Sequence, residues 1–353
     1  MSGAVRKKRK KFSYVDVLKD LFPWKGDDAL EVIRKLVFLT AIIVLGVCAY
    51  LIFDYFWDNY QARQEYDRLS GIYELAMQDN TTKNDDDEPI TTQQTAVTEI
   101  NDEGGIDIIK PMTILPGAEA LIQANPDTVG YIYIEGTNIN YPIVQKTDPN
   151  IGNEYYLTRS FMGEEFKAGA IFMDYRNRFD DIDNSDNIIV YGHNMKDNSM
   201  FGQLKYYKNT PDYYSQHPII HLSSNYNNYK YKIFGYFITN ALEKDGEMFE
   251  YYNYLNFDTE EKFYEFANGV KRRSIGLNDV DVKYGDQILT LSTCGSEFDE
   301  SRFVVVARRL REGEDELEGT QNSSVNPNPL MPDAYYKWRG GSYNPNAPFT
   351  PYG

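Results

Sequence analysis

An uncharged apolar run of eighteen residues, LVFLTAIIVLGVCAYLIF at positions 36–53, most constrains how this chain can fold. A helix rises about 1.5 Å per residue, so a run of this length nearly matches a hydrocarbon core of about 30 Å. The run has no polar face to turn toward water, as a surface helix of a soluble protein would have. We therefore expect residues 36–53 to form a transmembrane helix in a lipid bilayer.

The charges that flank the run predict its orientation. Residues 1–35 contain ten Lys and Arg against five Asp and Glu, whereas Asp54 and Asp58 follow the run. Because basic flanks stay in the cytoplasm, we expect the leader 1–35 to be cytoplasmic and residues from 54 onward to be outside the cell. No small-residue cleavage site follows the run, so we expect an uncleaved signal anchor.

The net charge and the two cysteines limit the partners and the redox chemistry that we expect for this chain. A net charge of −17 argues against a nucleic-acid partner, which needs a cationic surface. Of the two cysteines, Cys48 lies in the apolar run as a small apolar filler, and Cys294 lies outside with no partner in the same chain. Exported proteins usually pair their cysteines, so Cys294 is either a reactive or intermolecular thiol or an inert buried one.

Outside the membrane, the pattern changes three times along the chain. Helical spacing over 54–78 predicts a juxtamembrane helix, and the acidic, polar stretch 79–105 predicts a disordered tether. Short β-branched and aromatic runs between Gly, Asn and Asp turns then predict a mainly β barrel or sandwich. The chain thus divides into a leader (1–35), a transmembrane helix (36–53), a juxtamembrane helix and tether (54–105), a β-rich domain (106–312) and a disordered Asn/Pro/Gly-rich tail (313–353). One helix is predicted within the β-rich domain, over 258–273, with Asp258 as its cap.

Two neighbouring strands are predicted around Cys294. The segment QILTLSTC (287–294) alternates as a strand with one buried face, and FVVVA (303–307) is a continuous apolar run that suits a buried strand. The short loop 295–301 folds the second strand antiparallel beside the first, which places Arg302 next to Cys294. A cation there favours the thiolate and can stabilise an oxyanion. The alternative is a surface arginine that pairs with Asp299 or Glu300.

A thiol nucleophile also needs a group that moves protons, and the chain has three histidines. His193 ends the strand NIIVYGH at a predicted barrel rim, a position typical of catalytic side chains. His217 and His221 share one face if their segment is a strand, so a zinc pair is an alternative to a structural role. No third ligand clusters nearby, and His193 is therefore the candidate acid and base.

Several motifs together resemble the sortase family, and its class B in particular. They are TLSTC (290–294), RFVVVARR (302–309), NIIVYGHNMKDNSMFGQL (187–204), GAIFMDYRN (169–177) and NPDTVGYIYIEGTNINYPIVQ (125–145). The resemblance covers most of residues 110–310 in order. It implies a closed β-barrel of about eight strands with added helices, anchored by one membrane helix on the surface of a Gram-positive bacterium.

The resemblance also implies a reaction for the catalytic domain 106–312. Sortases cut a sorting motif, typically with a Pro-x-Thr element, near the C-terminus of secreted proteins. They hold the acyl fragment as a thioester and pass it to an amine of a peptidoglycan precursor or a pilin. Matched motif by motif, the nucleophile is Cys294, the proton-handling histidine is His193 and the oxyanion-binding arginine is Arg302, with no metal or organic cofactor. Two alternatives remain open, namely a cysteine protease that hydrolyses the same intermediate and a catalytically silent wall-associated adhesin or scaffold.

Overall fold

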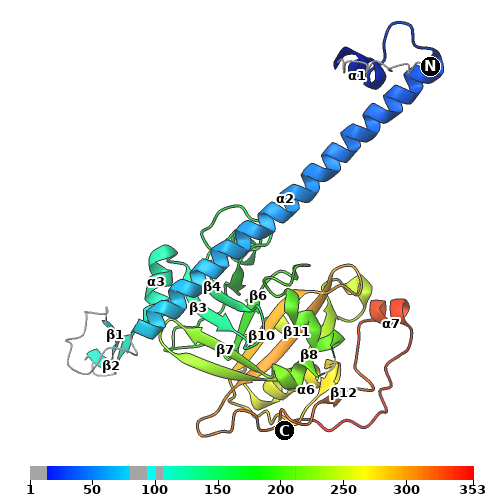
Figure 1. The fold of residues 1–353 in the computed structure, drawn as a ribbon. Helices are drawn as coiled ribbons and strands as arrows, with labels where there is room; N and C mark the ends of the chain where they lie inside the picture. Colours follow the sequence, from blue (N-terminus) through cyan, green and yellow to red (C-terminus); the bar gives the residue numbers. More distant parts are fainter. Residues whose placement is uncertain (1–13, 80–93, 101–105, 211) are drawn as a thin grey trace, which may run out of the picture. The chain divides into compact units, whose positions relative to one another are not determined.

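The computed structural model describes residues 14–79, 94–100, 106–210 and 212–353 (Figure 1). These residues fall into two compact units, 1–60 and 61–353.

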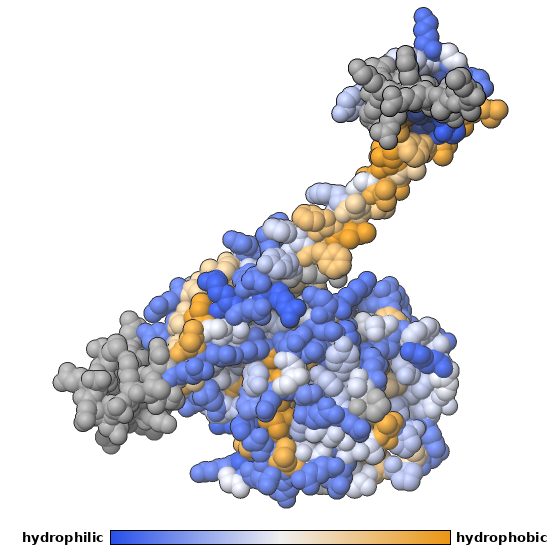
Figure 2. Space-filling model, viewed as in Figure 1, coloured by the Kyte–Doolittle hydropathy of each residue, from blue (hydrophilic) through white to orange (hydrophobic). Residues whose placement is uncertain are grey.

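The first unit holds helix α1 (Tyr14–Leu21) and the first part of helix α2 (Ala29–Asp79). Residues Ala29–Asp54 form a stretch of 26 residues with a mean hydropathy of 2.8, and none of its most apolar window is buried by the chain. Its apolar side chains follow α2 as an orange band in Figure 2. This stretch is long and apolar enough to cross a membrane. The predicted juxtamembrane helix is the continuation of α2 to Asp79.

The second unit is built on a closed barrel in the strand order β10-β11-β8-β7-β3-β4-β5-β6. Strand β10 runs parallel to β6, and β4 runs parallel to β5, while the other neighbours are antiparallel. The closed barrel of about eight strands that the family resemblance implies is confirmed. Its strands are β3 (Thr128–Tyr133), β4 (Asn140–Val144), β5 (Ile171–Met173), β6 (Asn187–Tyr191), β7 (Ile219–Ser224), β8 (Asn228–Asn240), β10 (Ile288–Cys294) and β11 (Ser301–Arg309).

Apolar side chains fill the barrel and also cover part of its outer face. Along β11, Val305 belongs to the interior cluster, whereas Val304 and Val306 join a second cluster beneath helix α6 (Glu260–Arg273). This double burial explains the continuous apolar run in β11. Strand β10 is likewise buried on both faces, and only its last residue, Cys294, is exposed. The expectation of one buried face for β10 was therefore wrong, because side chains from the 249–282 region cover the outer face.

Helices and short elements surround the barrel. The last turns of α2 pack on it, since the Tyr73 ring stacks on Tyr131 with 3.8 Å between ring centroids. Helix α6 is capped by Thr259, whose Oγ1 accepts from the Lys262 amide, one residue later than the predicted cap Asp258. The other elements are α3 (Pro116–Ala124), α4 (Tyr206–Asn209), α5 (Tyr213–Gln216), α7 (Asp333–Arg339), η1 (Gly152–Glu154), η2 (Gly202–Lys205), η3 (Glu243–Asp245), η4 (Tyr251–Asn253), β1 (Gln94–Ile100), β2 (Ile106–Thr113), β9 (Gly276–Leu277) and β12 (Ser324–Val325).

The two segments predicted to be disordered differ from that expectation where the structure describes them. Most of the tether 79–105 lies outside the described residues, but β1 within it pairs with β2. The tail 313–353 contains β12, which pairs with β9, and helix α7. Near its end, the Tyr352 amide donates to Asn268 Oδ1 of α6 at 2.7 Å, and Asn268 Nδ2 donates back to the Tyr352 carbonyl at 3.1 Å. Single residues that are far apart in the sequence hold the tail on the domain. Contacts of this kind leave no periodic pattern in the sequence.

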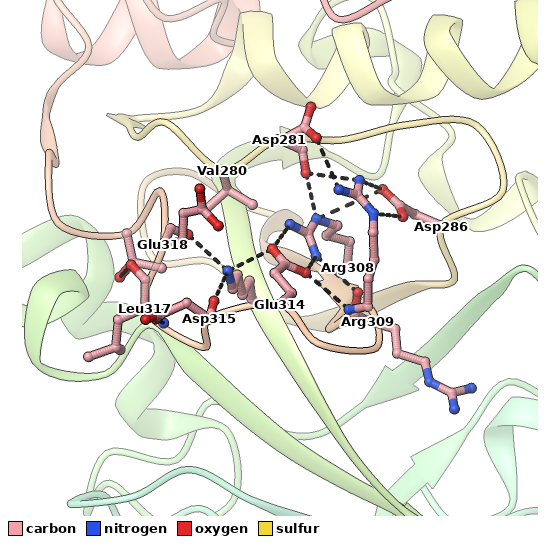
Figure 3. Close-up of polar contacts among 12 residues, drawn as sticks. Val280, Asp281, Asp286, Arg308, Arg309, Glu314, Asp315, Leu317 and Glu318 are labelled. Atoms are coloured by element: carbon pink, nitrogen blue, oxygen red, sulfur yellow. Dashed lines mark hydrogen bonds and ion pairs between the residues drawn. The ribbon is translucent and has the colours of Figure 1, made fainter.

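The beginning of the tail is held by two buried cations, Lys232 of β8 and Arg308 of β11 (Figure 3). Both share the carboxylate of Glu314, which lies 2.7 Å from Lys232 Nζ and 2.7 Å from Arg308 Nη1. Lys232 also donates to the carbonyl oxygens of Asp315 and Glu318. Hydrogen bonds from Arg308 hold the pKa of Glu314 well below its usual range. This carboxylate is thus the counter-ion of Lys232 and one of two counter-ions of Arg308, whose Nε also lies 3.8 Å from Asp286 Oδ2.

Removing that carboxylate should destabilise the barrel strongly. We expect Glu314→Gln to lower the free energy of unfolding by about 3–5 kcal/mol, because it leaves the buried ammonium of Lys232 without its counter-ion and takes one of two carboxylates from Arg308. The matched variant Glu316→Gln breaks an ion pair whose partners, Lys230 and Glu316, are each 41% exposed, and should change it by less than about 1 kcal/mol.

Denaturant unfolding of the full chain in detergent would measure both variants. Folding lowers the pKa of Glu314, so its ionised carboxylate stabilises the folded state above the unfolded pKa of about 4.3. This stabilisation is lost as the pH falls below that value. The difference in the free energy of unfolding between the wild type and Glu314→Gln should therefore become smaller in acid. Equal effects of the two variants at neutral pH would contradict this account.

Candidate active site

Three strand ends meet at one rim of the barrel. Cys294 at the end of β10 faces Arg302 of β11 in the antiparallel register, as the sequence predicts. On the other side of β10, Ser292 is the parallel partner of Tyr191 in β6. His193 lies two residues beyond Tyr191, as Cys294 lies two residues beyond Ser292, so the two side chains leave the barrel at the same end. The structure therefore brings the three predicted site residues together on adjacent strands.

Cys294 is an exposed free thiol on a fixed backbone. Its carbonyl oxygen accepts a hydrogen bond of 2.9 Å from Asn194 Nδ2, the residue after His193. One step before, the Gly192 amide donates to the Ser292 carbonyl at 3.2 Å. These two bonds extend the β6–β10 pairing to the rim, so the segments that bear the thiol and the imidazole are held together.

The imidazole of His193 is half-buried and oriented by a backbone carbonyl. Its Nε2 lies 2.7 Å from the Leu157 oxygen, an acceptor that requires a proton on Nε2. In the neutral ring, Nδ1 is then an acceptor, and in the imidazolium both nitrogens donate. The loop that carries Leu157 therefore fixes the tautomer of a group suited to acid and base chemistry.

Arg302 forms an ion pair with Glu300, as the alternative of a surface arginine predicts. Its Nη2 lies 3.0 Å from Glu300 Oε2, with side chains that are 29% and 50% exposed, and its Nη1 donates to the Ser301 carbonyl. An ion pair this exposed contributes about 0–1 kcal/mol and exchanges readily with a ligand. Glu300 itself has a left-handed φ of 57°, a conformation that costs of order 1 kcal/mol and often marks functional loops. Arg302 therefore pairs with Glu300 and also lies beside Cys294.

Sequence reasoning missed one buried polar group beside the thiol. The hydroxyl of Tyr251, in η4, lies 2.6 Å from Ser292 Oγ, and Ser292 is on the same face of β10 as Cys294. Burial raises the pKa of Tyr251 to about 12, so its phenol stays protonated at neutral pH. Tyr251 is one of 30 tyrosines and lies in no motif, so no signal in the sequence marks it.

The other two histidines lie elsewhere. His217 precedes β7 rather than lying in it, and its Nδ1 is 2.7 Å from the Glu135 carbonyl, so the same-face argument for a zinc pair fails. His221 is in β7 beside the Tyr133 ring. Among residues 14–79, 94–100, 106–210 and 212–353, no three His, Cys, Asp or Glu side chains gather as a metal site would need.

Comparison with known proteins shows the family of this chain. A family model of the sortase domain matches residues 132–310, which include all three site residues. Sortase B of Staphylococcus aureus is 36% identical over 203 residues, which cover 56% of this chain and 76% of that protein. The chain belongs to the sortase family. Sortase B of Listeria monocytogenes is 34% identical over 228 residues, which cover 64% of this chain and 83% of the relative.

A solved sortase B structure has the same fold as this sortase. The Staphylococcus aureus sortase B–substrate complex has a TM-score of 0.56 and 28% identity, and the match covers 73% of this chain and 100% of that one. The class B resemblance predicted from the motifs is thus confirmed, and sortases of this class are cysteine transpeptidases. The individual roles of His193, Cys294 and Arg302 in this sortase stay predictions.

Proposed function

We propose that this sortase is a membrane-anchored transpeptidase in which Cys294 is the nucleophile, His193 the acid and base, and Arg302 the oxyanion-binding cation. One observation carries the proposal. Cys294 and Arg302 are register partners, and His193 follows by two residues the end of β6, the strand that pairs with the other edge of β10. A thiol, a guanidinium and an imidazole on adjacent strand ends are the groups that acyl transfer through a thioester needs.

The first half of the proposed reaction forms the thioester. The thiolate of Cys294 attacks the scissile carbonyl carbon of the peptide, a C–S bond forms, and the carbonyl oxygen becomes an oxyanion facing the Arg302 guanidinium. Protonated His193 then gives its proton to the leaving nitrogen as the C–N bond breaks. The C-terminal fragment leaves as an amine, and neutral His193 remains.

The second half transfers the acyl group. An incoming amine attacks the thioester carbon, the new C–N bond forms, and neutral His193 takes the proton that the amine loses. The C–S bond then breaks and the Cys294 thiolate is regenerated. Transfer rather than hydrolysis requires that the amine reach the thioester before water does.

The proposed partners follow from the family. The Staphylococcus aureus relative has been solved as a substrate complex, and for this chain we propose secreted proteins with a Pro-x-Thr-type sorting motif as substrates. The acceptor is an amine of a peptidoglycan precursor or a pilin. The proposed anchor is the apolar run 36–53, which lies within the candidate span Ala29–Asp54, with the leader 1–35 cytoplasmic and the catalytic domain extracellular. Protease added to intact cells should therefore remove a C-terminal tag and spare an N-terminal one.

A peptide assay separates this proposal from its alternatives. The full chain in detergent is incubated with peptides that share a Pro-x-Thr element and vary in their flanks, together with triglycine or a lysine-containing peptide as amine donor. We expect an amide-linked product that increases with amine concentration while the hydrolysed product decreases. Hydrolysis alone at every amine concentration would favour a cysteine protease, and no cleavage of any peptide would favour a silent scaffold.

A further inference from the structure

A buried ion pair lies behind the candidate active site, formed by Lys208 of α4 and Glu297 of the β10–β11 loop. Lys208 Nζ is 2.5 Å from Glu297 Oε1, and the two side chains are only 3% and 9% exposed. The residues are 89 positions apart in the sequence. Two charges so far from solvent need each other, so this contact fixes α4 against the loop.

The pair lies where the segments that bear the three site residues meet. The chain that leaves His193 passes through η2 into α4 and brings Lys208 to the junction. Glu297 comes three residues after Cys294. Lys208 Nζ also lies 4.8 Å from the centroid of the Phe303 ring, and Phe303 follows Arg302. One ammonium thus contacts the segment after Cys294 and the segment after Arg302, and it is carried by the segment after His193.

The loop is folded tightly around the Glu297 carboxylate. The Ser296 amide lies 3.0 Å from Glu297 Oε2, and the Gly295 amide donates to the Ser301 carbonyl at 2.8 Å. A Cβ at position 295 would lie 2.9 Å from that same carboxylate oxygen and 2.3 Å from Ser301 Oγ. Glycine directly after Cys294 is therefore what lets the carboxylate close against the loop and reach Lys208.

We propose that the Lys208–Glu297 ion pair is a positioning device that sets Cys294 relative to Arg302 and His193. The inference rests on the proposed function, because it assigns the pair to the geometry of that reaction. Lys208 and Glu297 are positioning residues. Stability alone does not account for a buried ion pair, since well-packed apolar side chains in the same place are often as stable. What an apolar pair lacks is a directional contact that fixes the loop in one place.

The double variant Lys208→Met/Glu297→Leu tests this in the full chain in detergent, on a Cys48→Ala background. We expect it to remain folded with little change in Tm, while kcat falls about 10²-fold, as a displacement of about 1 Å can cause, and KM for the peptide changes much less. The rate of Cys294 alkylation by iodoacetamide should fall as well. The control Lys230→Met/Glu316→Leu removes an ion pair of the same length from the barrel surface and should keep wild-type kcat and alkylation.

A second variant covers the case in which the double variant unfolds. Glu297→Asp keeps both charges but shortens the carboxylate by one methylene, and it should lower kcat with the fold intact. Wild-type kcat and alkylation in either folded variant would overturn the proposal, as would a loss of activity that only follows the folded fraction. Alkylation needs no peptide or amine. A wild type without peptide turnover would therefore count against the proposed function, while the alkylation rates would still test the positioning.

Discussion

Cys294→Ala should abolish cleavage and transfer of a cognate peptide, with a fall in kcat/KM on the order of 10⁴-fold or more, because no other group at the rim can form the thioester. The substitution lies at an exposed strand end, so the thermal unfolding of the variant should match that of the wild type. Product formation over a range of peptide concentrations, measured by chromatography and mass spectrometry, tests the first expectation, and a thermal melt tests the second.

Cys48→Ala is the matched control, since it removes the other thiol from the apolar part of α2. Its turnover should equal that of the wild type. Substantial turnover by Cys294→Ala would remove the cysteine mechanism for this chain, and loss of turnover in Cys48→Ala would show that the second thiol takes part.

Arg302→Lys should lower kcat by about 10²–10³-fold while the protein stays folded. Lysine keeps the positive charge but loses the planar fork of donors that can hold a carbonyl oxygen as it becomes an oxyanion. The ion pair with Glu300 is exposed, so its loss should cost less than about 1 kcal/mol of folding free energy. Steady-state kinetics with one peptide and one amine, together with a denaturant titration, would measure the two effects separately.

Arg309→Lys provides the matched control at the opposite end of β11. Arg309 lies over the Tyr229 ring at 3.6 Å from its centroid, far along the strand from Cys294. Its replacement should leave kcat unchanged. If Arg302→Lys turned over as the wild type does, Arg302 would be only the surface partner of Glu300.

The strand-rich character of the domain and the Cys294–Arg302 contact were predictable because their signals are local, whereas the closed barrel followed from the family motifs. A loop of six residues joins β10 to β11, so antiparallel pairing follows from turn length and from two apolar runs. The place of His193 was only a guess from spacing, because the β6–β10 pairing is parallel and distant. Asn194 and Cys294, which bond at this junction, are 100 residues apart. The family motifs, rather than any local pattern, supplied that part of the site.

The contacts that support the site could not be predicted. Tyr251 reaches Ser292 across 41 residues and Lys208 reaches Glu297 across 89, and neither pair belongs to a motif or a periodic pattern. The order in the tail escaped prediction for a related reason. It depends on the Tyr352 backbone meeting Asn268 and on Glu314 meeting two buried cations, and a composition rich in Asn, Pro and Gly contains no trace of either contact.

In the proposed mechanism, Cys294 carries an acyl group that an amine removes. The most direct measurement is the intact mass of the full chain after rapid mixing with a cleavable peptide and acid quench, followed by peptide mapping. We expect a mass increase equal to the N-terminal acyl fragment, located on the peptide that contains Cys294. Adding the amine should discharge this adduct and yield the amide-linked product. An acyl group on another residue, or an adduct whose decay and products are the same with and without the amine, would contradict this mechanism.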